Sequence, residues 1–421
     1  MPAASPRPSP HERTIHPAAF VALMALLMSL QALAIDAMLP ALDEIAADLG
    51  TANPNDRQLV VGVFLMAAGA FSLIPGALAD RFGRRPVLFV SLGIYCAMSL
   101  LCGLVESFPA MIGARMLQAL GSAGLAVLPA AIVRDRFGGD SMARMLSTIS
   151  VVFMLVPILA PSLGQLILLI ASWRWIFLAM AVLAVAVGTW AWLALPETLN
   201  PEYRQKIEPR AILRNMAASI RVRSSVGYVF GSALVFGAMF GFINSAQQLV
   251  GEHFGMGDSF PLVFAACAGS MAIASFTNSR IVERFGARRV SHTALLTFIA
   301  VSAAQVWFAF RGGETIWQFA PLMAANMALL GFVGANFGSI AMQPFAAIAG
   351  AASSVQAFLR MSLGALIGAL IGRAYDGSSR PLALALLVGG IVALALVLYS
   401  ERGKLFRRIH PPGAPRPMPN P

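Results

Sequence analysis

The chain has 421 residues, of which 58% are hydrophobic and 12% are charged, and its formal net charge is +11 at pH 7. A soluble domain of this length would carry about twice that charged fraction, so a soluble globular protein is excluded and a membrane protein is predicted. The three cysteines all lie in apolar runs, without the spacing of a disulfide framework or a metal site.

The chain begins with a proline-containing segment of little net charge, residues 1–17, which is predicted to be a short cytoplasmic tail. The apolar run that starts at Ala18 contains Ala32-Leu33-Ala34, which resembles the cleavage site of a secretory signal. Because the run is longer than the apolar part of a typical signal, we expect it to be retained as the first transmembrane helix.

A membrane-spanning helix needs ~20 mostly apolar residues, and twelve stretches of this chain meet that condition. They are residues 18–39, 58–79, 87–106, 109–133, 145–170, 173–195, 225–250, 260–282, 290–310, 316–340, 353–373 and 381–400. The longest polar stretch between them, the linker 196–224, separates a six-helix bundle (18–195) from a second one (225–400), and residues 401–421 form a second tail. The predicted fold class is an all-α membrane protein.

Lys and Arg are distributed unevenly among the predicted loops. Of the 30 basic residues, 23 lie on the side that carries both tails, five lie on the other side, and Arg115 and Arg360 lie within spans. Short cytoplasmic loops retain positive residues, so both termini are predicted to face the cytoplasm. The basic charge is therefore a topology signal, and no nucleic-acid partner is predicted.

Apart from Glu106, the last residue of the third stretch, Asp36 is the only acidic residue inside a predicted span, about one turn from its non-cytoplasmic end. A charged carboxylate at a helix centre costs ~2.5–3.5 kcal/mol on insertion scales, so we expect it to face a wet cavity. A carboxyl group that is neutral in one state and charged in another is what proton coupling requires. The alternative is a structural hydrogen bond near the mouth of the bundle, because Pro40 follows one turn later.

The loop after the second span repeats after the eighth span. Residues 76–85 read Gly-Ala-Leu-Ala-Asp-Arg-Phe-Gly-Arg-Arg, and residues 279–288 read Ser-Arg-Ile-Val-Glu-Arg-Phe-Gly-Ala-Arg, an offset of 203. Both loops join the second and third helices of a half. The chain therefore contains a parallel internal repeat, an arrangement found in secondary transporters.

The fourth and fifth spans contain unusual residues. Arg115 lies about two turns into the fourth span and keeps its charge, so it needs an acceptor or water unless it snorkels to the interface. Pro157 and Pro161 remove two backbone donors within about one turn and are expected to kink the fifth span. A hinge and a packing role are both open for these prolines.

The second half carries polar side chains in or near its spans. Some are expected to line a cavity and others to link helices: Asn244, Gln247, Gln248, Asn326, Asn336, Gln343 and Gln356. Arg360 lies near the cytoplasmic end of the eleventh span. It either snorkels or takes part in a cavity that favours anionic or polar substrates.

Residues 76–85 resemble the signature loop of the major facilitator superfamily. Arg115-Met-Leu-Gln-Ala-Leu-Gly121 resembles the fourth-helix motif of its proton-coupled drug exporters. Residues 35–42, 132–135 and 278–282 resemble the bicyclomycin-resistance and chloramphenicol-efflux (Bcr/CflA) branch. In the fifth span, Val156-x-x-x-Ala-Pro-x-x-Gly-Gln165 departs from the usual Gly-x-x-x-Gly-Pro-x-x-Gly-Gly antiporter signature, which leaves import open beside export.

The resemblance implies a major-facilitator fold and roles for individual residues. Arg115 is expected to act in proton coupling together with Asp36, and the fifth-span hinge is expected at Pro157, Pro161 and Gly164. A conformational latch is expected at Gly76, Asp80, Arg81, Gly83, Arg84, Arg85 and Asp135. In this latch Asp80 would meet the start of the eleventh helix, and Arg84 or Arg85 would bond Asp135.

The leading functional hypothesis is a monomeric antiporter of the bacterial cytoplasmic (inner) membrane. It would export small lipophilic or amphipathic, drug-like compounds in exchange for protons, with the proton gradient as its energy source and no cofactor. The alternative is proton-coupled uptake or efflux of one specific metabolite on the same fold. An enzyme is not predicted, because no span contains a metal motif or a nucleophile with a partner base.

Overall fold

The computed structural model describes residues 16–51, 53–137, 139–200, 202 and 222–407, and every regular element in these ranges is helical. The long helices are α1 (Pro17–Asp36), α3 (Leu59–Phe71), α4 (Leu73–Phe82), α5 (Arg84–Leu104), α6 (Phe108–Arg136), α7 (Gly139–Leu168), α8 (Arg174–Ala194), α10 (Arg223–Gln248), α11 (Phe260–Phe285), α12 (Ala287–Arg311), α13 (Ile316–Met342), α14 (Ala349–Arg373) and α15 (Arg380–Ser400). A short helix, α2 (Leu42–Leu49), follows α1.

Within the described ranges, eleven segments are long and apolar enough to cross a membrane, and the bent pair α3–α4 raises the number to twelve. The prediction of an all-helical membrane protein is therefore confirmed. Many large apolar side chains remain exposed on the outside of the helices, among them Leu169, Ile170, Leu262 and Trp317. Such an exterior is suited to contact with lipid.

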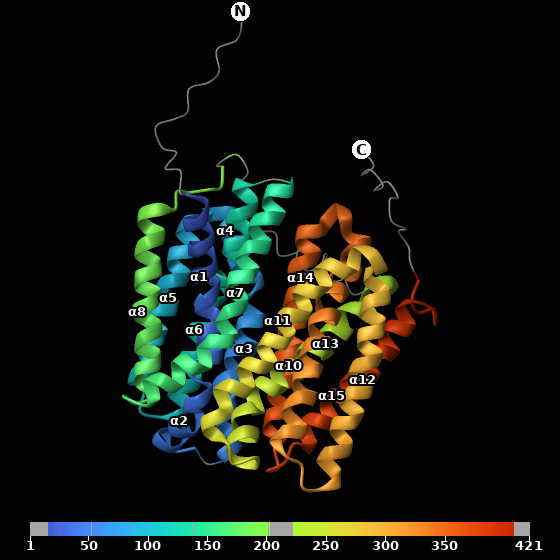
Figure 1. Cartoon of the computed structure of the whole chain (residues 1–421). Helices are drawn as coiled ribbons and strands as arrows, with labels where there is room; N and C mark the ends of the chain where they lie inside the picture. The colour runs from blue at the N-terminus through green and yellow to red at the C-terminus, as the bar shows by residue number, and fades with distance from the viewer. Residues whose placement is uncertain (1–15, 52, 138, 201, 203–221, 408–421) are drawn as a thin grey trace, which may run out of the picture.

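The helices form two groups (Figure 1). Helices α1–α8 pack with one another and form the N-terminal bundle, and helices α10–α15 form the C-terminal bundle. The bundles meet mainly where α3 packs on α14 and where α7 packs on α11. At the first of these contacts, a Cβ atom at Gly69 would lie 2.8 Å from the backbone nitrogen of Ser362, so the two helices approach closely there.

The molecule has two ends, which contain different sets of chain connections. The terminal end contains the start of α1, the loop around Gly83 and the end of α15, where Ser400 Oγ donates to the carbonyl of Arg223 at 2.6 Å. The distal end contains α2 and the connecting residues 50–51, 53–58, 249–259, 312–315 and 374–379. By the Lys and Arg distribution, the terminal end is expected to be cytoplasmic.

The second span is broken, whereas the sequence suggested one helix over residues 58–79. Helices α3 and α4 meet at Ser72 at an angle of 41°. The reason is Pro75, which has no N–H with which to bond the carbonyl of Phe71 and so interrupts the helix. At the break, the Ser72 hydroxyl donates to the carbonyl of Gly69 at 2.8 Å.

Candidate functional site

Arg115 lies on α6 in the interior of the N-terminal bundle, and its side chain is fully buried. Its Nε donates to the carbonyl of Val60 on α3 at 3.1 Å, and its Nη2 donates to the carbonyl of Ala34 on α1 at 2.7 Å. Its Nη1 donates to the side-chain oxygen of Gln118. The guanidinium carbon lies 4.1 Å from the ring centre of Phe64. Arg115 thus joins three helices of one bundle through uncharged acceptors.

Gln118 extends this network to α5. Its Nε2 donates to Ser99 Oγ at 2.7 Å, and Ser99 in turn donates to the carbonyl of Tyr95 at 2.7 Å. The Tyr95 hydroxyl donates to the carbonyl of Leu30 on α1, again at 2.7 Å. Gln118 received no role in the sequence analysis, although its spacing of three residues from Arg115 places both side chains on one helix face.

Asp36 is the last residue of α1 and is only 4% exposed. The helix ends there because Pro40 has no N–H to donate to the Asp36 carbonyl, and a 3₁₀ turn over Leu39–Ala41 leads on to α2. Among the described residues, none forms a hydrogen bond or an ion pair with the Asp36 carboxyl group. Arg115 binds the backbone two residues earlier and does not pair with it.

Helix α7 packs against the break that follows Asp36. A Cβ atom at Gly164 would lie 2.9 Å from the carbonyl carbon of Ala37, 3.2 Å from Cγ of Pro40 and closer still to the Ala37 oxygen. The backbones can therefore meet at this place only with glycine. The two prolines of the same segment, Pro157 and Pro161, lie inside α7. The antiporter-like segment thus contacts the chain directly after Asp36, which the sequence alone did not show.

The loop between α4 and α5 forms a cluster at the terminal end of the N-terminal bundle. Arg84 is the residue that bridges it: its Nη1 lies 2.5 Å from Asp80 Oδ1, and its Nε lies 2.8 Å from Asp135 Oδ2 at the end of α6. Arg85 instead donates to the carbonyl of Trp192 on α8 at 2.9 Å and stacks over that ring.

Other parts of the expected latch take separate positions. Gly76 faces α6, where a Cβ atom would lie 3.9 Å from Val127, and Arg81 is exposed. The expected contact of Asp80 with the start of α14 involves residues 346–354, whose side chains the structure does not describe.

Glu197 lies far from this loop in the sequence but binds it directly, and the sequence analysis did not identify it. Its carboxylate accepts the backbone N–H groups of Arg84 at 2.9 Å and Arg85 at 3.1 Å, which are the first two residues of α5. A negative charge at a helix N-terminus is favourable. The loop turns at Gly83, whose φ of +107° favours glycine, and Gly286 has φ +86° at the repeat offset of 203. The repeat therefore shares its turn geometry, whereas no local signal links Glu197 to it.

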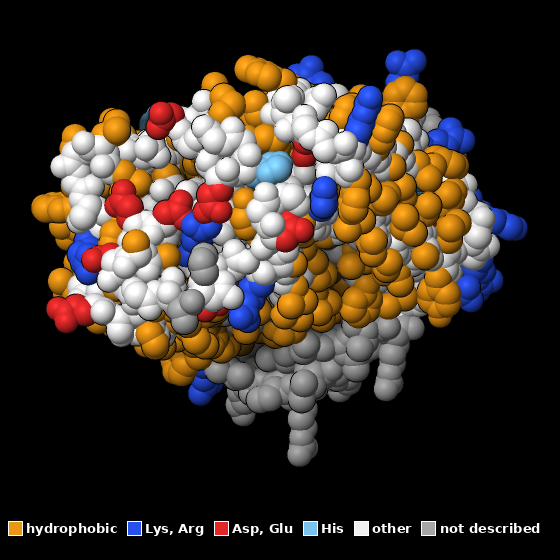
Figure 2. All heavy atoms as spheres, turned by 90° about the horizontal axis from the view of Figure 1, so that it is seen from below, with side chains coloured by type: hydrophobic (Ala, Val, Ile, Leu, Met, Phe, Trp, Pro, Cys, Tyr) orange, Lys and Arg blue, Asp and Glu red, His pale blue; other side chains and the backbone are white. Residues whose placement is uncertain are grey.

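At the distal end, polar side chains join the two bundles. This cluster, the distal seal, is made of Asp43, Asn55, Arg57, Gln58, Gln247, Gln248 and Glu252. The buried Arg57 forms ion pairs with Asp43 of its own bundle and with Glu252 of the other. Figure 2 looks onto this end and shows acidic and basic side chains gathered there. Among the described residues, every ion pair between the bundles lies at this end.

The amides of the seal complete the junction between the bundles. Gln58 is hydrogen-bonded to Gln248, Gln247 donates to Asp43, and Asn55 Nδ2 donates to the carbonyl of Tyr375 at 2.8 Å. In this structure, therefore, the two glutamines that were expected near a cavity lie in a contact between the bundles.

The remaining cavity candidates occupy different places. Asn244 lies beside Gly62 and Gly372, between the bundles, and its buried Oδ1 has no partner in the described part of the chain. Asn336 on α13 donates to Asn278 on α11 at 2.7 Å and links these helices. The Gln343 side-chain oxygen accepts a hydrogen bond from Arg288 at 3.0 Å. Arg360 lies over the ring of Phe236.

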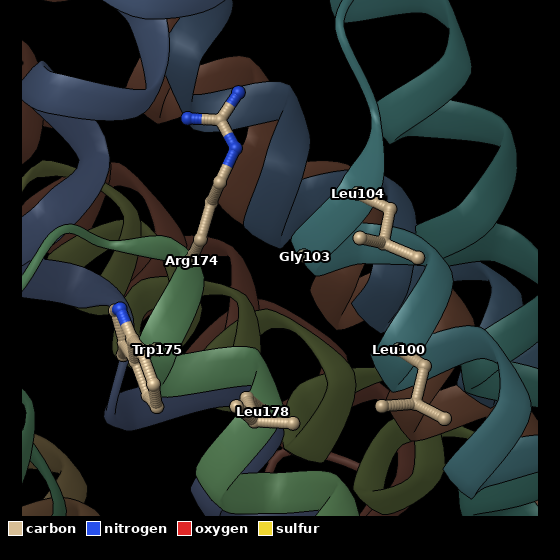
Figure 3. A pocket seen from close by; sticks show the side chains of 6 residues that line it. All are labelled: Leu100, Gly103, Leu104, Arg174, Trp175 and Leu178. Atoms are coloured by element: carbon tan, nitrogen blue, oxygen red, sulfur yellow. The ribbon is translucent and has the colours of Figure 1, made fainter.

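A shallow pocket of about 220 Å³ lies between α5 and α8, away from these groups (Figure 3). Its lining residues are Leu100, Gly103, Leu104, Arg174, Trp175 and Leu178. Arg174 extends away from the apolar side chains and forms an ion pair with Asp48. Leu104 is 75% exposed and Trp175 is 56% exposed, so the pocket belongs to the lipid-facing exterior.

Comparison with known proteins shows that similar sequences and a similar fold occur among transport and drug-resistance proteins. A bicyclomycin resistance protein homolog of Haemophilus influenzae is 26% identical over 384 residues, which cover 90% of this chain and 95% of that protein. Multidrug resistance protein MdtL of Escherichia coli O9:H4 is 29% identical over 376 residues, covering 88% and 92% of the two chains. The solved structure of a bacterial homolog of the human lysosomal transporter Spinster superposes with a TM-score of 0.68 at 15% identity and covers 92% of this chain and 96% of that chain.

The family assignment is carried by residues 24–369, which match the model described as Major Facilitator Superfamily. The match includes the loop with Arg84, the Arg115 network and most of both bundles. The protein is thus a multi-pass secondary transporter and not an enzyme. The chain belongs to the Major Facilitator Superfamily.

Proposed function

We propose that this transporter exports small amphipathic, drug-like compounds from the bacterial cytoplasm in exchange for protons. It would act as a monomer in the inner membrane, with both termini in the cytoplasm. The observation that carries this proposal is the buried carboxyl group of Asp36, which lies at the break of the first span without a cationic partner among the described residues. Burying an ionised carboxylate without a partner costs several kcal/mol, so movement of the surrounding helices can change its charge.

The contact between α1 and α7 supplies that movement. Gly164 packs on the Ala37 carbonyl, one residue beyond Asp36. A shift of α7 relative to α1 therefore changes how far the carboxyl group is shielded from water. Arg115 holds the last turn of α1 through the Ala34 carbonyl, so it positions Asp36 without neutralising it.

Alternating access requires the distal seal to separate. In the present conformation Arg57 and Glu252 join the bundles at the distal end, which we expect from the charge distribution to face the periplasm. We propose that separation of this pair, and of Gln58 from Gln248, exposes the α1 break to the outside, where Asp36 takes up a proton. Return to the present conformation then carries the proton inward.

The names of relatives support the direction of transport and the substrate class. One relative is described as a bicyclomycin resistance protein homolog and another as a multidrug resistance protein, and both align over most of their length. Resistance by this route requires that a compound leaves the cell. Export of drug-like compounds is accordingly favoured over uptake of one metabolite.

Inverted membrane vesicles with an imposed acidic-inside pH gradient test the proposal. Addition of compounds from a panel that includes bicyclomycin and chloramphenicol should partly collapse the gradient with the wild-type protein. The Asp36→Asn variant should lose this response at least tenfold while retaining compound binding. Glu106→Gln, which neutralises an exposed carboxylate in a loop at the distal end, is the matched control and should behave like the wild type. A well-expressed wild type that responds to no compound would contradict the proposal.

A further inference from the structure

Arg360 is a cation in the C-terminal bundle that has no anionic partner among the described residues. It lies on α14, and no carboxylate of the described residues comes within 4.0 Å of its side chain. Its guanidinium carbon instead lies 4.6 Å from the ring centre of Phe236 on α10. The Arg360 side chain is only partly exposed. A guanidinium in such a place normally finds a carboxylate or phosphate.

The contact with Phe236 offers the guanidinium no oxygen acceptor, so it does not satisfy the N–H groups of Arg360. A cation over a ring face is attracted by the electrons of the ring. The N–H groups of a guanidinium lie in one plane and can pair with a carboxylate through two parallel hydrogen bonds. Among the described residues, none accepts a hydrogen bond from Arg360.

Gln356 supplies a second unused donor on the same face of α14. The two residues are four positions apart, so their side chains are neighbours on the helix surface. The Gln356 Nε2 atom is buried and has no hydrogen-bond partner in the described part of the chain. A buried amide donor without an acceptor is costly. Both groups donate, so together they would bind a ligand rich in acceptors.

The surroundings of this pair are apolar and lie beside the contact between the bundles. Phe236 packs against Gly334 of α13, where a Cβ atom would lie 3.2 Å from the ring. The next two residues of α14, Met361 and Ser362, contact Gly69 of α3. That contact lies immediately before the Ser72 break, beyond which the second span bends by 41°.

From this geometry we infer that Arg360, Gln356 and Phe236 form a subsite for a carboxylate attached to an aromatic or other flat apolar body. The carboxylate pairs with the Arg360 fork and accepts from Gln356 Nε2, and the apolar part lies beside Phe236. The inference rests on the proposed function, because it assigns a substrate class to the same transporter. Within the amphipathic, drug-like compounds proposed above, it assigns acidic compounds as substrates.

Equilibrium binding to the purified full-length protein in lipid nanodiscs tests this subsite. The probes are 2-naphthoate and 2-naphthamide, which have nearly the same shape and differ in charge. The wild type should bind the naphthoate at least tenfold more tightly than the amide. Arg360→Gln should abolish this preference and leave amide binding within about twofold, whereas Arg360→Lys should keep part of it. Arg311→Gln, which removes an exposed charge from the same bundle, should keep the preference unchanged.

Equal affinities in the wild type, absence of binding by either probe at millimolar concentration, or an unchanged preference in Arg360→Gln would overturn the subsite. Circular dichroism and thermal unfolding of each variant show whether it is folded. Because binding is measured without a pH gradient, failure of proton antiport in vesicles does not affect this result. Failure of the subsite likewise leaves antiport of neutral compounds untouched.

Discussion

Replacing Gly164 with alanine tests the contact between α7 and the break in α1. The new methyl group would lie 2.9 Å from the Ala37 carbonyl carbon and 3.2 Å from Pro40 Cγ, and nearer to the Ala37 oxygen. Ordinary carbon contacts are about 3.5–4.0 Å. The obstacle is backbone, so the methyl group cannot be accommodated by a rotamer change and the helices must separate.

The expected change in the stability of Gly164→Ala follows from two opposing contributions. Overpacking of this kind costs about 1–3 kcal/mol, whereas alanine is favoured over glycine inside a helix by about 0.8–1.0 kcal/mol. Gly93→Ala on α5 gives the second contribution alone, because nothing lies within 4 Å of its added Cβ. The difference in stability between the two variants should therefore be about 1–3 kcal/mol, with Gly164→Ala the less stable.

Thermal unfolding in detergent and substrate-induced proton flux in inverted vesicles measure this prediction. Gly164→Ala should melt at a lower temperature than Gly93→Ala and should transport at least tenfold more slowly, because the α1–α7 contact adjoins Asp36. If Gly164→Ala matches Gly93→Ala in both measurements, the two helices do not pack as described and the proposed route of coupling is wrong.

Three further predictions concern other parts of the structure. Glu252→Gln should weaken the pair with Arg57 and raise the outward-facing population, measured as a longer distance between spin labels across the distal seal; an unchanged distance distribution would argue against the seal. Gly83→Ala should destabilise the terminal-end loop by about 1–3 kcal/mol in thermal unfolding, because φ is +107° and the new Cβ would lie 3.1 Å from Glu197 Cδ; wild-type stability would contradict this. Burial raises the pKa of Glu314 in the loop between α12 and α13 although a Ser379 hydrogen bond opposes the shift. The folded state therefore binds this proton more tightly, and stability falls as pH rises through the raised pKa. Glu314→Gln should remove that part of the pH dependence, and identical pH profiles would refute it.

Much of the fold was accessible from the sequence because membrane spans carry a strong apolar signal. The spans and the parallel repeat were predicted from length, hydropathy and the paired loops, and both turn glycines of the repeat, Gly83 and Gly286, adopt positive φ. The break of the second span was missed. Its cause, Pro75, was visible in the sequence, but prolines are tolerated in transmembrane helices, so its presence alone does not predict a bend.

The site was accessible only in part, because sequence patterns give residue types without their partners. Asp36 and Arg115 were identified as unusual ions in spans, yet whether they meet depends on helix rotation, and the structure shows that they do not pair. The distal seal was not predicted, since Arg57 and Glu252 are 195 positions apart and lie in ordinary polar loops. Glu197 was missed for the same reason.

The most direct test of the central claim measures protons released when purified protein binds substrate. In a weakly buffered solution containing a pH indicator, the wild type should release protons on binding a compound that it transports, and the release should disappear in Asp36→Asn while binding persists. Equal proton release by the two proteins would show that another group carries the proton and would contradict the mechanism proposed for Asp36.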